Sequence, residues 1–532
     1  MPNKQQQELT ITSKTGFATL EILLAMFILL LSLTAVITVS FGSQSMVIDS
    51  RASSEALNIA QELLKKAQAD ANQDLNLVNP YSAKSPDNFY DENVTVTHLF
   101  ENGKPNYFAK LVTVAVSWNG EFNHQQKIAL SALVTNFDNV LRGDTCSSLL
   151  GDIDSATGNL NYNPEAWKNP EIKNQYSACG LAGISDNYCS ITDIDAYNGK
   201  LYVALGKTSS GSTPALLIYN IDYQNRQLSF DKAIDNSHNN AIVAVPDRKT
   251  QKMYAYAANA SVVNPLQIIN LDEMKVEDIP ALKISAKAQG NSIFYKNGYI
   301  YLGLKETPKN KISIIDVHNP SSAFEIGSWP ADANSTSTIN SIYAAGNYAY
   351  ITDTQSKKPI ILDISNPAHP QEIAKTIDYS DSSANNGKSA VVAGNTLYFG
   401  RVWKVGPSGK TFYILDATDP AAADWPILGY DSGSNQKSVD GIIVRGKTNG
   451  NNSAAYPALA FVLTPRYLKI FDVTNNNSIS TWGNLFFDGT NGSSDVAGSS
   501  IYEPVFDCEG NTLFIGSNDD NHKGYISVIA PH

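Results

Sequence analysis

The chain has 532 residues, of which 42% are hydrophobic and 10% aromatic. This apolar content is enough for a large core and excludes wholesale disorder. Only 17% of the residues are charged, and 51 acidic against 39 basic residues give a net charge of −12, so nucleic-acid binding is not expected. Four cysteines are too few for a disulfide scaffold, and the length predicts about three to four domains.

A long apolar segment follows the polar N-terminal residues. Residues 17–41 read FATLEILLAMFILLLSLTAVITVSF, and Glu21 is the only charged residue among them. At about 1.5 Å per helical residue, this segment is long enough to cross a hydrocarbon core of about 30 Å. A cleaved secretory signal has a shorter apolar region, of about 7–15 residues. A plain membrane anchor does not explain an ionisable residue inside the span.

The string KTGFATLE resembles the processing signal of type IV pilins and pseudopilins. In that family a dedicated prepilin peptidase cleaves after the glycine, which is Gly16 here. The new N-terminal residue, here Phe17, is then methylated, and the glutamate at the fifth mature position, here Glu21, is a hallmark of the family. The resemblance implies a leader over residues 1–16. It also implies three partners: the peptidase, the inner or cytoplasmic membrane before assembly, and other pilin subunits.

A physical role for Glu21 follows from its charge. Cleavage leaves a charged amine on Phe17, and packing that amine among the apolar side chains of a filament requires a counter-charge. We therefore expect Glu21 of one subunit to align with the N-terminus of the next. If Glu21→Ala left incorporation into filaments at the wild-type level, this role would be wrong.

The helical pattern continues beyond the apolar segment and ends at Asn79-Pro80. Apolar residues recur there at spacings of three and four: Ala52, Ala56, Ile59, Leu63 and Ala67. This pattern predicts one long helix over residues 17–79. Residues 80–137 predict a small antiparallel sheet with hairpin turns at Asn-Gly pairs. The strings KLVTVAVSWNG and QKIALSALVTN resemble the heads of minor pilins.

Residues 191–532 repeat a unit of about 50 residues. Each unit has one strand with an aromatic residue among apolar ones and a second strand such as LLIYNI or ISIIDV. Tight-turn signals such as Asn198-Gly199 and Asn297-Gly298 precede most of the first strands. The aromatic positions mark seven units: Tyr202, Tyr254, Tyr301, Tyr350, Tyr398, Phe461 and Phe514. The pattern predicts a seven-bladed β-propeller, and the strings ISIIDV and IILDIS, each followed by Asn-Pro, resemble LVIVD repeats, which form propellers.

The last repeat unit ends without an outer strand. A propeller can close by borrowing a strand from the other end of the repeat region, and residues 165–190 of a linker predicted over 138–190 could supply it. All four cysteines lie near this closure: Cys146, Cys179, Cys189 and Cys508. A local Cys179–Cys189 pair and a Cys146–Cys508 pair across the closure suit this arrangement. Four cysteines allow three connectivities, and the sequence does not decide among them.

No catalytic or metal-binding motif occurs in the sequence. HExxH, GxSxG and CxxC are absent, and the seven histidines have no metal-ligand spacing. The acidic stretch 151–161 lacks the ligand spacing and the closing glutamate of a calcium loop, so calcium binding has no support. We therefore expect no cofactor and no enzyme. Loop aromatics are the candidate contacts for an unknown surface ligand: Trp403, Trp425, Tyr430 and Trp482.

An aspartate recurs at one place in four of the repeat units: Asp316, Asp363, Asp416 and Asp472. A residue repeated from blade to blade is expected to make the same turn contact in each blade rather than to form a metal or catalytic site.

Together these features predict an α+β pilin-like module, with a long N-terminal helix on a small antiparallel sheet, followed by an all-β C-terminal β-propeller of seven blades. The predicted divisions are a leader over 1–16, a transmembrane and pilin helix over 17–79, a head over 80–137, a linker over 138–190 and a propeller over 191–532.

The predicted function is that of a minor pilin, at the tip or at sparse positions of a type IV pilus, which presents the propeller for adhesion or ligand binding. One alternative is an assembly or priming pseudopilin of a pilus or secretion system. A second alternative is a propeller enzyme tethered to the envelope. The predicted location is a membrane-anchored precursor and then the outside of the cell, on a pilus or the cell surface.

Overall fold

The computed structural model divides the chain into two compact units: residues 1–66, 80–95 and 112–132 in the first, and 67–79, 96–111 and 133–532 in the second. It describes residues 15–73, 78–85, 88–101, 104–120, 124–135, 146, 149–153, 160–185, 189–206, 214–235, 238–247, 252–279, 282–284, 288–305, 310–330, 337–373, 386–402, 410–420, 425–431, 438–445, 458–476, 478–487 and 502–532. For some of these residues the backbone alone is described: 15–23, 25, 35–50, 72–73, 98–101, 104–109, 135, 151–153, 160–162, 310 and 502–503.

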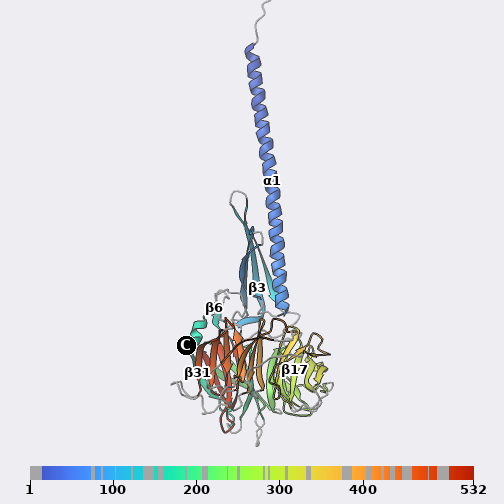
Figure 1. The fold of residues 1–532 in the computed structure, drawn as a ribbon, viewed down its shortest axis with the longest axis vertical. Coiled ribbons are helices and arrows are strands. Elements are labelled where there is room, and N and C mark those ends of the chain that lie inside the picture. The colour runs from blue at the N-terminus through green and yellow to red at the C-terminus, as the bar shows by residue number, and fades with distance from the viewer. Residues whose placement is uncertain are drawn as a thin grey trace, which may run out of the picture. The chain divides into compact units, whose positions relative to one another are not determined.

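The helix α1, Thr15–Gln73, is the long blue coil in Figure 1. Its sequence contains no proline, and it ends before the Asn79-Pro80 pair, in line with the exclusion of proline from helix interiors. In the first unit, Ala56 and Ala60 of α1 are fully buried, and Ala52 O accepts a hydrogen bond from the Tyr90 hydroxyl at 3.2 Å. Small residues on this face of the helix therefore let the sheet approach it closely.

The structure does not support the predicted membrane anchor. A membrane-spanning helix needs about 20 consecutive apolar residues. Among the residues that the structure describes, no helix combines that length with sufficient apolar content. The prediction of a membrane-anchored precursor, with the location derived from it, is therefore wrong.

A four-stranded antiparallel sheet, in the order β1-β2-β3-β4, follows the helix. On β3, Val112, Val114 and Val116 are fully buried and alternate with half-buried residues, as the period of a strand requires. The Tyr90 and Trp118 rings meet edge to face at 6.0 Å beside these valines. The strands of this sheet are β1 Tyr81–Lys84, β2 Asp91–Glu101, β3 Lys104–Asn119 and β4 Gln125–Thr135.

Seven further four-stranded sheets fill the second unit, where Figure 1 shows them as the blades of a ring. The first three contain β8 Ile191–Tyr197, β9 Lys200–Leu205, β10 Leu216–Asp222 and β11 Gln227–Ile234; β12 Asn239–Pro246, β13 Met253–Asn259, β14 Leu266–Asn270 and β15 Lys275–Val276; and β16 Gln289–Lys296, β17 Tyr299–Lys305, β18 Asn310–Asp316 and β19 Phe324–Pro330. The next three contain β20 Ile339–Ala345, β21 Tyr348–Asp353, β22 Ile360–Asp363 and β23 Gln371–Ile373; β24 Gly387–Ala393, β25 Thr396–Arg401, β26 Phe412–Asp416 and β27 Ile427–Tyr430; and β28 Gly441–Arg445, β29 Leu459–Leu463, β30 Tyr467–Asp472 and β31 Ser480–Phe486. The last contains β32 Tyr502–Glu509, β33 Thr512–Asn518, β34 Gly524–Pro531 and, from the other end of the repeat region, β7 Pro170–Ser177.

Shorter elements connect these parts. The strands β5 Gly151–Ile153 and β6 Leu160–Tyr162 pair with each other. The helix α2 spans Ala178–Leu181, and the 3₁₀ helices are η3 Pro164–Lys168 and η4 Pro320–Ser322.

The predicted α+β fold class is corrected by this arrangement. The chain is mostly β, with four-stranded sheets recurring from β1 to β34. Helical periodicity is confined to the N-terminal part of the sequence, whereas strand and turn patterns occupy nearly all of the remainder. The class of the chain is therefore mainly β.

Successive side chains along a strand point alternately toward the two neighbouring blades. Phe514 packs toward the first sheet, with Leu201 and Val203, whereas Ile515 packs toward the sixth, with Phe461. Because successive strand residues point to opposite faces, each sheet contributes to two layers of the core. The ring therefore depends on contacts between the first and last sheets as much as on any other pair.

A left-handed turn between first and second strands recurs around the ring. In the third sheet the backbone at Gly298 has φ +79°, a conformation that favours glycine. A Cβ there would lie 2.4 Å from His318 Nε2, so the Asn-Gly signal read from the sequence also makes room for a side chain of the next turn.

Candidate functional site: the junction that closes the propeller

The strand β7 completes the last sheet by pairing with β34. Their antiparallel ladder runs from Pro170 opposite Pro531 to Ser177 opposite Tyr525. The borrowed strand expected from residues 165–190 thus occupies 170–177. This pairing joins the beginning of the second unit's ring to its end.

Two disulfides flank the closure strand. Cys146 is bonded to Cys508 with a Cα–Cα distance of 5.1 Å, and Cys179 is bonded to Cys189 at 6.1 Å. These are the two pairs named from the sequence. Cys146 precedes β7 in the chain, and its bond connects that preceding segment to β32. The Cys179–Cys189 bond closes the short connection between β7 and β8. We call the region around Cys146, Cys508, β7 and η3 the closure junction.

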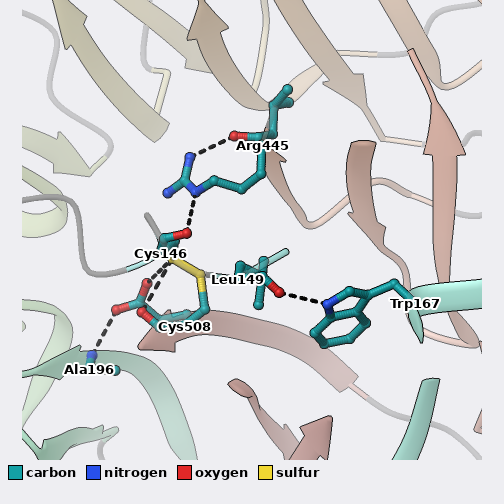
Figure 2. The surroundings of a disulfide bond; sticks show 8 residues. Cys146, Leu149, Trp167, Ala196, Arg445 and Cys508 are labelled. Atoms are coloured by element: carbon teal, nitrogen blue, oxygen red, sulfur yellow. Dashed lines mark hydrogen bonds between the residues drawn. A yellow bond between two sulfur atoms is a disulfide. The ribbon is translucent and has the colours of Figure 1, made fainter. Parts of the chain in front are cut away.

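The Cys146–Cys508 bond is surrounded by contacts to three blades (Figure 2). Arg445, at the end of β28 in the sixth sheet, donates from Nε to Cys146 O at 2.8 Å. Asp507, next to Cys508 in the seventh sheet, accepts from Ala196 N of the first sheet at 2.7 Å. The disulfide therefore lies where the sixth, seventh and first sheets are held together.

A second acidic side chain links the last sheet to the first. Glu509 is only 1% exposed, and its two carboxylate oxygens each lie 3.0 Å from Gly199 N, at the turn between β8 and β9. A buried carboxylate is favourable only when hydrogen bonds compensate for its loss of water. Glu509 therefore fastens the first turn of the ring to its last blade.

The segment before β7 lies against the sixth and seventh sheets. Trp167, in η3, is fully buried and donates from Nε1 to Leu149 O at 2.6 Å. Trp482, on β31, donates from its indole to Pro164 O at 3.0 Å, and Lys168 Nζ lies 4.5 Å from the centre of its ring. We call residues 163–169 the strap, because they cross the outer strand of the sixth sheet before β7 begins.

Burial changes the acidity of a tyrosine at the other end of β7. The Tyr219 hydroxyl donates to Ala178 O, directly after β7, at 2.5 Å. Loss of water around this hydroxyl raises the pKa of Tyr219 well above its usual range. The group therefore remains a neutral donor at physiological pH.

Among the residues that the structure describes, one group of potential metal ligands comes together: Cys146, Asp507 and Cys508. Zinc and similar metals bind the cysteine thiolate. Both sulfurs are already bonded to each other, so this group is not a metal centre.

The sequence-predicted processing residues lie in α1. Gly16, Phe17 and Glu21 are all within Thr15–Gln73, and their side chains lie outside the described part of the chain. Their proposed roles in cleavage and filament alignment stay predictions.

The loop aromatics proposed as ligand contacts do not form one site. Trp425 is 3% exposed and packs in the core of the fifth sheet, and Trp482 holds the strap. Tyr430 is 41% exposed, with Lys410 Nζ at 3.3 Å from its ring centre. Trp403 lies outside the described residues. Among the three of these aromatics that the structure describes, Tyr430 alone therefore keeps the surface position expected of a contact residue.

The repeated aspartates have the structural role expected of them. Each accepts a hydrogen bond from the backbone N–H two residues later, at 2.9–3.0 Å: Asp316, Asp363, Asp416 and Asp472. This is the side-chain turn that aspartate favours, and the prediction is confirmed.

Sequence reasoning missed three residues of the closure junction. Arg445, Glu509 and Trp167 belong to no motif, and each acts on a chain segment far away in sequence. For Glu509, the sequence offers one signal, which is its position directly after Cys508 and before the Gly510-Asn511 turn.

Comparison with known proteins identifies the repeats and does not identify a function. The LVIVD repeat family matches residues 290–330 and 338–376, which coincide with the third and fourth sheets of the ring. The chain therefore contains LVIVD repeats, consistent with a propeller-like region. No curated protein matches the chain in sequence.

Several solved structures are similar in fold. The periplasmic gluconolactonase PpgL of Pseudomonas aeruginosa is 11% identical, with a TM-score of 0.41, covering 74% of this chain and 96% of that one. A putative 6-phosphogluconolactonase of Bacteroides uniformis is 12% identical, with a TM-score of 0.38, covering 54% and 85%. One from Bacteroides fragilis is 9% identical, with a TM-score of 0.41, covering 63% and 95%.

These structures correct one expectation. The chain was predicted not to be an enzyme, whereas the similar structures are named as lactonases, and that prediction is not retained. At identities of 9–12% the similarity concerns the fold alone, and TM-scores of 0.38–0.41 carry no argument about an activity or a substrate.

Proposed function

We propose that the protein is a pilin-like filament subunit that presents a closed β-propeller for adhesion or ligand binding. The observation that carries the proposal is the combination of a complete ring of seven sheets with the N-terminal string KTGFATLE on a long helix. Its proposed partners are other pilin subunits, a prepilin peptidase and a surface ligand of the propeller. The two disulfides suit a compartment outside the reducing cytosol.

The size of the second unit favours a tip or sparse position. Residues 133–532 form its main part. A body of this size is difficult to repeat on every subunit of a tightly packed filament. One copy at the end of a filament, or a few along it, avoids that crowding.

The decisive experiment removes the whole propeller. Because β7 and Cys146 belong to the ring, a clean deletion removes residues 136–532 rather than starting at 191. We expect filaments in normal number and loss of attachment. Unchanged attachment would refute the adhesive role, and loss of filaments would favour the assembly or priming role instead.

The filament part of the proposal has its own test at Glu21. We expect Glu21→Ala to reduce the incorporation of the protein into isolated filaments, measured by immunolabelling. Glu62→Ala, an exposed carboxylate further along α1, is the matched control and should incorporate normally. Equal incorporation of both variants would argue against a pilin-type subunit.

The binding part can be tested at Tyr430. Exposed aromatic rings are frequent anchors of binding surfaces. We expect Tyr430→Ala to weaken attachment more than Phe230→Ala, which removes another exposed aromatic, 37% accessible, from the outer strand β11. Equal effects would exclude Tyr430 as a specific contact.

A further inference from the structure

We propose that the Cys146–Cys508 disulfide carries the tension that a filament exerts on the propeller. It passes tension from the preceding chain directly into β32 and so shields the strap and β7. The inference rests on the proposed function, because tension arises when a filament pulls on a propeller that is bound at a surface.

The order of elements along the chain shows what tension would otherwise reach. After Cys146 the chain continues to Leu149, then to the strap, then to β7. The β7–β34 ladder begins at Pro170, the end of β7 nearest to Cys146 in sequence. Without the disulfide, a pull on the preceding chain would strip off the strap and then open this ladder one pair at a time from Pro170. Such stepwise opening requires far less force than shearing all pairs together.

The outcome of stripping β7 would be an open ring. β7 is the fourth strand of the last sheet, and its pairing with β34 joins the start of the ring region to its end. A covalent bond from Cys146 to β32 removes residues 147–507 from the path of the tension. The closure strand then carries no load while the disulfide is intact.

The surroundings of Cys508 spread the load over three blades (Figure 2). Arg445 ties Cys146 O to the sixth sheet, and Asp507 ties β32 to Ala196 of the first sheet. Glu509 makes a further buried link to Gly199. Force that enters at Cys508 therefore reaches adjacent blades through several hydrogen bonds rather than through one strand.

The second disulfide provides a natural control. Cys179–Cys189 lies after β7 and spans a sequence separation of only 10 residues. It is not on the path from the preceding chain to the ring. Its removal should therefore leave the response to force nearly unchanged.

The test is single-molecule stretching of the full chain, held at its N-terminus and at His532. In the wild type, the ring can release only the residues after Cys508, which number 532 − 508 = 24, or about 80 Å at ~3.3–3.6 Å per residue. In Cys146→Ser/Cys508→Ser, a separation of 362 residues less the 10 still held by the other bond leaves 352. These add about 1,200 Å of extension. Cys179→Ser/Cys189→Ser should extend like the wild type.

The wild type alone can overturn the inference, whatever the folding of the variant. Release of the additional 1,200 Å or so by unreduced wild-type protein would show that the bond does not protect the ring. Release of the extra length in the variant only at forces no lower than the force at which the wild type releases the residues after Cys508 would also overturn it, because β7 would then not be a weak point.

A flow assay separates this inference from the proposed function. Cells with Cys146→Ser/Cys508→Ser should attach at rest like the wild type but detach at several-fold lower shear, whereas Cys179→Ser/Cys189→Ser should detach like the wild type. Equal detachment of both variants would show that the Cys146–Cys508 bond does not carry the tension, while leaving adhesion intact. Absence of attachment by the wild type itself would instead count against the proposed function.

Discussion

Removing the Cys146–Cys508 bond should destabilise the propeller about twice as much as removing Cys179–Cys189. In the chain-entropy description, a disulfide stabilises by restricting the unfolded chain, and the effect grows with the logarithm of the loop length. Separations of 362 and 10 residues give about 6 and about 3 kcal/mol at 25 °C. The expected ranking is thus set by how far apart in sequence the partners lie.

Urea unfolding followed by tryptophan fluorescence measures this difference. Trp118 is the only one of the six tryptophans that precedes residue 133, so the signal reports mainly on the second unit. With an m-value of about 3 kcal/mol per molar urea, the midpoint should fall by about 2 M in Cys146→Ser/Cys508→Ser and by about 1 M in Cys179→Ser/Cys189→Ser. Reduced wild-type protein, as a control, should unfold near the midpoint of the reduced variants. Equal shifts, or the larger shift in the short-loop variant, would refute the reasoning.

Three further substitutions test the closure junction and its surroundings. Glu509→Ala leaves the buried Gly199 N–H without this acceptor and should cost about 1–3 kcal/mol, measured as a shift in urea midpoint. Gly483→Ala places a Cβ 2.4 Å from Trp167 O and should displace the strap, seen as faster hydrogen exchange at residues 163–169, whereas exposed Thr481→Ala should not. Burial raises the pKa of Tyr219, so its stabilising effect is complete below pH 10, the usual value, and is lost as the pH rises above it. Between pH 10 and 11, the wild type should therefore lose about 1 kcal/mol more stability than Tyr219→Phe, which has no hydroxyl to ionise; equal losses would contradict this assignment.

The propeller repeats could be predicted because each blade carries its own local signals. The left-handed glycine turn, as at Gly298, and the aspartate turn, as at Asp316, recur in several blades and make the same kind of local contact in each. Such signals depend on neighbours within a few residues. They therefore survive in the sequence even though successive blades are otherwise dissimilar.

The closure was only partly predictable because its residues act over long distances in the chain. β7 reads PEIKNQYS, with one buried residue and no clear alternation, so only its pairing with β34 identifies it as a strand. Arg445 and Glu509 look like ordinary surface charges in the sequence. Their hydrogen bonds to Cys146 O and Gly199 N span separations of 299 and 310 residues, which no local pattern records.

The membrane and enzyme predictions failed for a related reason. The apolar segment was interpreted from its length and composition, whereas no helix among the residues that the structure describes is long and apolar enough to span a membrane. The absence of catalytic motifs was interpreted as absence of catalysis, although catalytic groups in a propeller can come from several blades without forming a motif. Both inferences used local sequence for a property that belongs to an assembled surface.

Closure by an early strand also imposes an order on folding. β34 begins at Gly524, far along the chain from the end of β7 at Ser177, so β7 has no partner until Gly524–Pro531 is available. Pairings between distant segments form late because the loop-closure entropy must be overcome first. Cys508 lies 362 residues after Cys146, so their bond also depends on a late segment of the ring. The strand pairing brings the strap and Cys146 to β32, and the disulfide then makes the closure permanent. Until the disulfide forms, the ring can open by separation of β7 from β34.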